Sequence, residues 1–152
     1  MIPMALFNHI ALQVSDLEKS KEFYRKYIGL VPLFEHGISG PQFEKVSGIS
    51  GFDVTFAVLN DKKSDANIEL VEFHNDFSDT VSTFSHIAFE VEDVDTLYSV
   101  LKKDGIRTIS EPVTISHPHE KITGKRFFYF ADPDGHMIEA YNKKEGLYSD
   151  NV

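Results

Sequence analysis

An internal repeat constrains the fold of this chain more than any other feature. The stretch "FNHIALQVSD" near the start returns as "FSHIAFEVED" past the middle, and six residues recur at one constant spacing: Phe7 and Phe84, His9 and His86, Ile10 and Ile87, Ala11 and Ala88, Val14 and Val91, Asp16 and Asp93. Further along, "NIELVEF" and "HMIEAYN" share an Ile-Glu pair, which matches Glu69 with Glu139. Such a repeat indicates two copies of one supersecondary unit.

Each copy predicts the same order of elements. The opening stretch alternates with period two, which predicts a strand that turns His9 to one face and Ile10 and Leu12 to the other. Apolar residues at helical spacing follow in both copies, and three strand-like runs come after each helix: "LVPLFEH", "VTFAVLN" and "IELVEF", then "TISEPVTI", "RFFYFA" and "MIEAYN". The sequence therefore predicts an α+β fold made of two tandem βαβββ modules.

Local signals predict where the two helices begin and end. Ser15 followed by Glu18 is a capping-box pattern for the first helix, and Gly29 ends that helix. Asp93 can cap the second helix, which Gly105 ends. Both helices are therefore expected to cover one face of their module.

The remaining segments predict turns and connections. The quartet Asp132, Pro133, Asp134 and Gly135 suits a type I turn between the last two strands. The Gly- and Ser-containing segment from Gly37 to Phe52 predicts a mobile loop near a site. We expect one domain over residues 1–152, with module 1 at 5–74, a linker at 75–83, module 2 at 84–142 and a C-terminal tail at 143–152.

Composition narrows the class of protein. A chain of 152 residues with 41% hydrophobic residues suits one globular domain. The net charge of −9 argues against nucleic-acid binding, because no basic cluster is available to contact phosphates. The absence of cysteine excludes disulfides and thiolate metal sites and favours the cytoplasm. No basic leader and no long apolar run is present, so neither a secretory signal nor a membrane span is expected.

Four residues stand at equivalent places in the two copies and carry the predicted chemistry. Each copy has a histidine on its first strand and a glutamate flanked by apolar residues on its last strand: His9, Glu69, His86 and Glu139. A strand carboxylate between apolar neighbours is costly to bury unless a cation neutralises it. Any one of these residues alone suits a solvated or structural role. Their joint repetition predicts one divalent metal ion, with open positions for water or substrate.

Other polar residues give weaker signals. Lys125 and Arg126 stand at the start of a predicted strand, where they could bind a substrate carboxylate or phosphate or simply lie in solvent. His117 and His119 are favoured as residues of a solvated loop. Glu72 and His74 end their strand and are expected to be exposed.

Several motifs together resemble the vicinal oxygen chelate superfamily, which includes glyoxalase I, methylmalonyl-CoA epimerase, fosfomycin-resistance enzymes, extradiol dioxygenases and bleomycin-resistance proteins. The resemblance rests on "NHIALQVSDLEKSKEFYRKYIGL", "IELVEF", "SHIAFEVEDVDTLYSVLKKDGI" and, most specifically, "YFADPDGHMIEAYN". It implies paired βαβββ modules that form a cupped mixed sheet around one metal ion. The glyoxalase I-like ligand pattern selects the same four residues as the repeat.

The resemblance implies a metal-dependent lyase or isomerase of the glyoxalase type. A divalent ion such as Zn, Ni, Co or Mn would bind adjacent oxygens of a small substrate, and Glu69 or Glu139 would move a proton through a metal-bound enediolate. The alternatives are an epimerase like methylmalonyl-CoA epimerase, a metal-free drug-binding protein of the bleomycin-resistance type, and metal-dependent oxygen or thiol-transfer chemistry. A homodimer is expected, because open sheet edges need cover.

Overall fold

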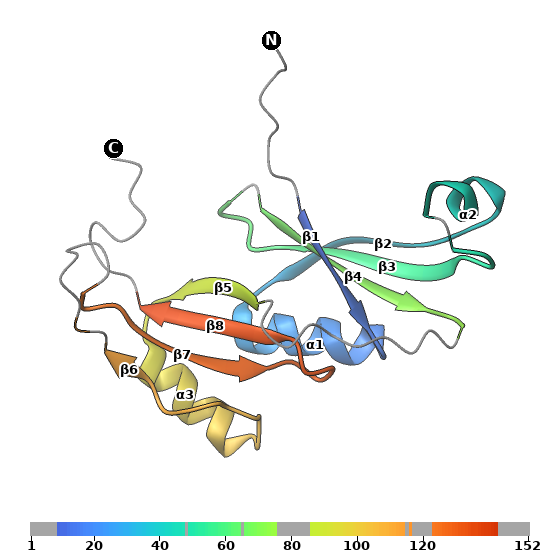
Figure 1. Ribbon diagram of the computed structural model, residues 1–152. Helices are drawn as coiled ribbons and strands as arrows, with labels where there is room; N and C mark the ends of the chain where they lie inside the picture. Colours follow the sequence, from blue (N-terminus) through green and yellow to red (C-terminus); the bar gives the residue numbers. More distant parts are fainter. Residues whose placement is uncertain are drawn as a thin grey trace, which may run out of the picture. The chain divides into compact units, whose positions relative to one another are not determined.

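The computed structural model of the chain describes residues 9–47, 49–64, 66–75, 86–114, 116 and 123–142. The chain divides into two compact units, Met1–Thr80 and Val81–Val152 (Figure 1). His117, His119, the proposed tail at 143–152 and all but Asn75 of the proposed linker at 75–83 lie outside the described residues.

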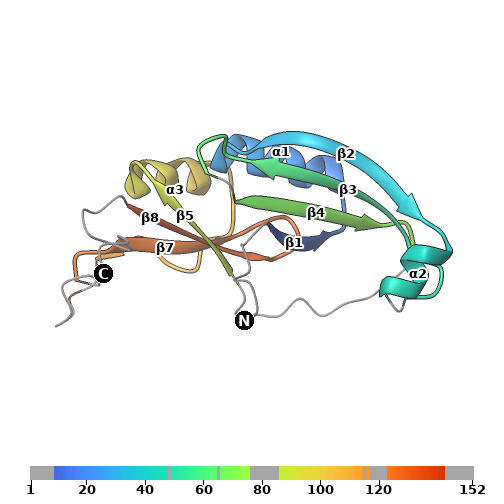
Figure 2. The same cartoon turned by 90° about the horizontal axis from the view of Figure 1, so that it is seen from above.

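The first unit is a mixed four-stranded sheet with the strand order β1-β4-β3-β2. Its elements are β1 (His9–Val14), α1 (Leu17–Ile28), β2 (Val31–Ser39), α2 (Pro41–Ser47), β3 (Asp53–Asn60) and β4 (Asn67–Phe73). β1 runs parallel to β4, and the other neighbouring strands are antiparallel. Helix α1 contacts β3 and β4, and α2 lies at the end of β2 in both views (Figures 1 and 2).

The second unit repeats this arrangement with the strand order β5-β8-β7-β6. Its elements are β5 (His86–Val91), α3 (Val94–Lys103), β6 (Val113–Thr114), β7 (Arg126–Ala131) and β8 (Met137–Asn142). β5 is parallel to β8, and α3 contacts β7 and β8. The predicted βαβββ order is therefore confirmed in each unit, with α2 as an addition to the first.

Each sheet buries one face under its helix. In the first unit Tyr24 of α1 is fully buried, as is Leu70, while Ile68 is nearly so. In the second unit Phe128 and Ile138 are buried in the same way. Glu69 lies between Ile68 and Leu70 on β4, and Glu139 follows Ile138 on β8. Because side chains alternate along a strand, both glutamates point to the opposite face of their sheet.

The helix boundaries correct one sequence prediction. The N-cap of α1 is Asp16 and not Ser15: the Asp16 carboxylate accepts a hydrogen bond from the Lys19 amide at 2.9 Å. The capping-box reading failed because serine and aspartate are both good caps and stand side by side here. The predicted cap Asp93 is confirmed for α3, and Gly29 ends α1 with a φ of 82°, which favours glycine.

The connections differ more from expectation. The segment from Gly37 to Phe52 is not one loop, since it holds the end of β2 and helix α2, which opens with Pro41 at its first position. Of the run "TISEPVTI", the described residues 108–114 form the two-residue strand β6 and an isolated bridge from Thr108 to Phe130. Pro112 lacks the N–H that a continuous ladder needs.

None of the helices in the ranges given above has the length and apolar character that crossing a membrane requires.

Candidate metal site

The first His–Glu pair lies on neighbouring parallel strands of one sheet. Ala11 of β1 pairs with Glu69 of β4, so His9, two residues before Ala11, points to the same face. The His9 Nε2 and Glu69 Oε2 atoms are 3.9 Å apart. The Glu69 side chain is 25% exposed and that of His9 43% exposed. The fold thus brings the two predicted ligands of module 1 together.

The second pair repeats this geometry in the other unit. Ala88 of β5 pairs with Glu139 of β8, and His86 precedes Ala88 by the same two positions. The His86 Nε2 and Glu139 Oε2 atoms are 3.4 Å apart. Here the glutamate is buried, because only 6% of its side chain is exposed. The two pairs therefore share one register and differ in burial.

Glu139 has two further partners. The Lys125 ammonium donates to Glu139 Oε1, and the Tyr129 hydroxyl donates to Oε2 at 3.1 Å. Lys125 is itself buried, and its ammonium lies 4.6 Å from the centre of the Phe127 ring and 5.2 Å from that of Tyr141. The sequence analysis did not identify Tyr129 as a site residue, although the alternation of "RFFYFA" puts it on the same face as Lys125.

Arg126 points elsewhere. Its guanidinium donates to both carboxylate oxygens of Asp95 in the first turn of α3, at 2.9 and 2.7 Å, and to the Thr114 hydroxyl at 3.0 Å. The hydrogen bond from Arg126 lowers the pKa of Asp95. These contacts tie β6 and β7 to the start of α3.

The turn before β8 gathers three potential metal ligands, Asp132, Asp134 and His136, whose donor atoms lie within 4.8 Å of one another. Asp132 already serves the turn: its carboxylate accepts from the amides of Asp134 and His136 at 2.9 and 2.8 Å, and its other oxygen lies 2.7 Å from His136 Nδ1. This hydrogen bond raises the pKa of His136 despite its burial. The Gly135 amide donates to the Asp132 carbonyl, which confirms the predicted turn.

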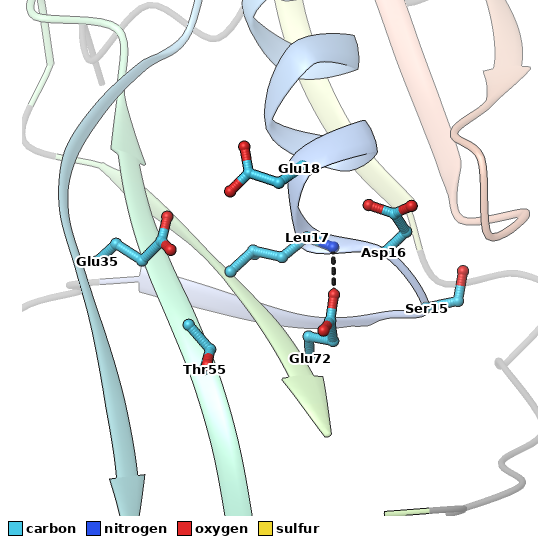
Figure 3. A pocket seen from close by; sticks show the side chains of 7 residues that line it. All are labelled: Ser15, Asp16, Leu17, Glu18, Glu35, Thr55 and Glu72. Atoms are coloured by element: carbon cyan, nitrogen blue, oxygen red, sulfur yellow. Dashed lines mark hydrogen bonds between the residues drawn. The ribbon is translucent and has the colours of Figure 1, made fainter. Parts of the chain in front are cut away.

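A hollow of about 440 Å³ opens at the start of α1 (Figure 3). Its lining is mostly acidic: Ser15, Asp16, Leu17, Glu18, Glu35, Thr55 and Glu72. Glu72 is half-buried rather than exposed as predicted, because its carboxylate accepts a hydrogen bond from the Leu17 amide. His74 is exposed as predicted and lies 3.0 Å from Asp53 Oδ1.

Two βαβββ units, each with a histidine on its first strand and a glutamate on its last, define a paired βαβββ protein. The model of the Glyoxalase/Bleomycin resistance protein/Dioxygenase superfamily matches residues 6–140, and the chain belongs to this superfamily.

Named relatives and a solved structure agree with this membership. The chain is 32% identical over 137 residues to mitochondrial methylmalonyl-CoA epimerase of Homo sapiens, covering 87% of this chain and 70% of the epimerase. It is 27% identical over 139 residues to lactoylglutathione lyase of Neisseria meningitidis, covering 91% of each. A glyoxalase family protein from Bacillus cereus superposes with a TM-score of 0.77 at 21% identity, covering 93% of this chain and 95% of the other, which confirms the fold.

Proposed function

We propose that this protein is a divalent-metal-dependent lyase or isomerase of the glyoxalase type, in which His9, Glu69, His86 and Glu139 hold one metal ion. The observation that carries the proposal is the repetition of one His–Glu pair at one register in both units. The proposal also assigns residues 5–74 and 84–142 to two modules of a single domain.

The spacing of the donor atoms supports a metal site. Two ligands that each bind one ion at about 2.1 Å lie roughly 3.0–3.4 Å apart. The N-to-O separation is 3.4 Å in the second pair and 3.9 Å in the first, so only small side-chain adjustments are needed. Imidazole with carboxylate is a donor set that suits Zn, Ni, Co or Mn.

The chemistry follows from these donors. A bound divalent ion would supply positive charge opposite the negative charge that develops on two adjacent substrate oxygens. A glutamate at the same face can accept a proton from the neighbouring carbon and return it elsewhere. The cation of Lys125 or Arg126 is proposed to orient an anionic part of the substrate. For Lys125 this requires a contact shared with Glu139, and for Arg126 it requires release of Asp95.

Two substrate classes fit the superfamily relatives: the hemithioacetal of a 2-oxoaldehyde and a thiol, and a branched acyl-CoA ester. The similarity to lactoylglutathione lyase favours the first, and the somewhat higher identity with methylmalonyl-CoA epimerase favours the second. Both reactions move a proton next to a carbonyl group, so one measurement reports on either.

The test is proton exchange with solvent. Protein loaded in turn with Zn²⁺, Ni²⁺, Co²⁺ or Mn²⁺ is incubated in deuterium oxide with methylglyoxal plus glutathione, or with methylmalonyl-CoA. We expect deuterium in one product, and its loss after chelation of the metal. A protein that exchanges no proton with either substrate while it binds a drug-like ligand equally well with and without chelator would instead be a metal-free binding protein.

A further inference from the structure

The two half-sites differ in what surrounds the carboxylate. Tyr129 of β7 is paired with Glu139, and Val58 of β3 is paired with Glu69, so these two positions are equivalent. Lys125 precedes Tyr129 by the same number of residues as Val54 precedes Val58. The cation and hydroxyl that hold Glu139 are therefore replaced by two valines beside Glu69, and valine side chains have no donor.

This difference fixes one carboxylate and leaves the other adjustable. Glu139 cannot turn away without leaving the buried Lys125 ammonium and its own buried carboxylate uncompensated, which is costly. The Glu69 side chain is 25% exposed, so water can solvate its carboxylate when the side chain changes conformation. A conformational change of Glu69 is therefore much less costly than the same change of Glu139.

We propose that the half-sites have unequal roles: Lys125 and Tyr129 are positioning residues that fix Glu139 as a permanent metal ligand, while Glu69 is a weaker ligand whose side chain can change conformation. The inference rests on the proposed function and names the residues that hold one of its metal ligands in place. The carboxylate geometry supports it, because Lys125 holds Oε1 and Tyr129 holds Oε2, and Oε2 also lies 3.4 Å from His86 Nε2.

The test measures Zn²⁺ affinity by titration calorimetry, together with the melting temperature of the metal-free protein. The variants are E69Q, E139Q, K125M and the double variant K125M/E139Q, with K102M, at an exposed lysine of α3, as the charge-matched control. We expect E139Q to weaken Zn²⁺ binding at least about tenfold more than E69Q, because it leaves a buried ammonium beside the ion. Removing that ammonium in K125M/E139Q should restore part of the affinity.

The melting temperature provides the second measurement. K125M and E139Q should each lower it by several degrees in the absence of metal, and the double variant should recover part of the loss, whereas E69Q and K102M should leave it close to that of the wild type. Equal loss of Zn²⁺ affinity in E69Q and E139Q, or a K125M melting temperature equal to that of K102M, would overturn the inference alone. A wild type that binds no Zn²⁺ would overturn the proposed function as well.

Discussion

At the scale of single residues, four buried charged side chains of the second unit lie in two pairs of opposite charge. Lys125 neutralises Glu139, and His136 lies against Asp132 in the turn before β8. Removing one member of such a pair leaves an uncompensated group in a poorly solvated place. These pairs therefore determine how the second unit responds to substitution and to pH.

The His136–Asp132 pair predicts a pH dependence of stability. The pKa of His136 is raised from its ordinary value of 6.5, chiefly by the hydrogen bond with Asp132. The stabilisation is then fully present below about pH 6.5, the pKa of histidine in the unfolded chain, and is lost as the pH rises through the higher pKa of the folded state. In urea unfolding, the wild type should lose stability over this range, and H136Q should lose less.

The matched control for this prediction is His74, an exposed histidine whose Nδ1 lies 3.0 Å from Asp53 Oδ1. H74Q should keep the wild-type pH dependence. If H136Q and the wild type show the same slope, the pair does not contribute to stability in this way.

The four ligand candidates could be predicted from the sequence because one His–Glu pair recurs in each copy of the repeat. The face of the sheet to which each side chain points follows from the alternation along its strand. The Lys125–Glu139 contact could not, since these residues meet only across the β7–β8 hairpin. A substrate contact of Lys125 stays a prediction, and nothing in the spacing of "GKRFFYF" indicates that this cation also faces a glutamate.

At the scale of elements, helix α1 depends on a cap that the sequence pattern misassigned. Asp16 satisfies the Lys19 amide, while Ser15 lies one residue outside the helix. We expect D16A to lower the free energy of unfolding by about 1 kcal/mol. S15A, the comparison one residue earlier, should change it by less than D16A does, and denaturant titration of both variants would measure the difference. A larger loss in S15A than in D16A would show that serine is the effective cap.

The regular elements could largely be predicted, because amphipathic helices and alternating strands carry strong periodicity. The region between β2 and β3 could not, because α2 is short and its start depends on the Gly40–Pro41 step rather than on an apolar pattern. β6 is shorter than the sequence predicts. Its run has a strand-like pattern, but Pro112 within that run lacks a backbone N–H.

At the scale of the whole molecule, we expect a homodimer. β2 is an edge strand of the first sheet, and Leu33 and Phe34 on it are 51% and 55% exposed. An apolar edge of this kind favours cover by another chain. Light scattering after size exclusion should give twice the mass of one chain, and F34E should shift the protein toward the monomer. A wild-type monomer at micromolar concentration would contradict this expectation.

The proposed function depends on one metal ion held by His9, Glu69, His86 and Glu139. The most direct measurement is the stoichiometry and affinity of Zn²⁺ binding in the wild type, H9A and H86A, with H74Q as the control. We predict one ion per chain in the wild type and in H74Q, and a loss of affinity greater than about tenfold in H9A and H86A alike. A wild type without bound ion, or an H9A variant that binds Zn²⁺ as tightly as the wild type, would contradict it.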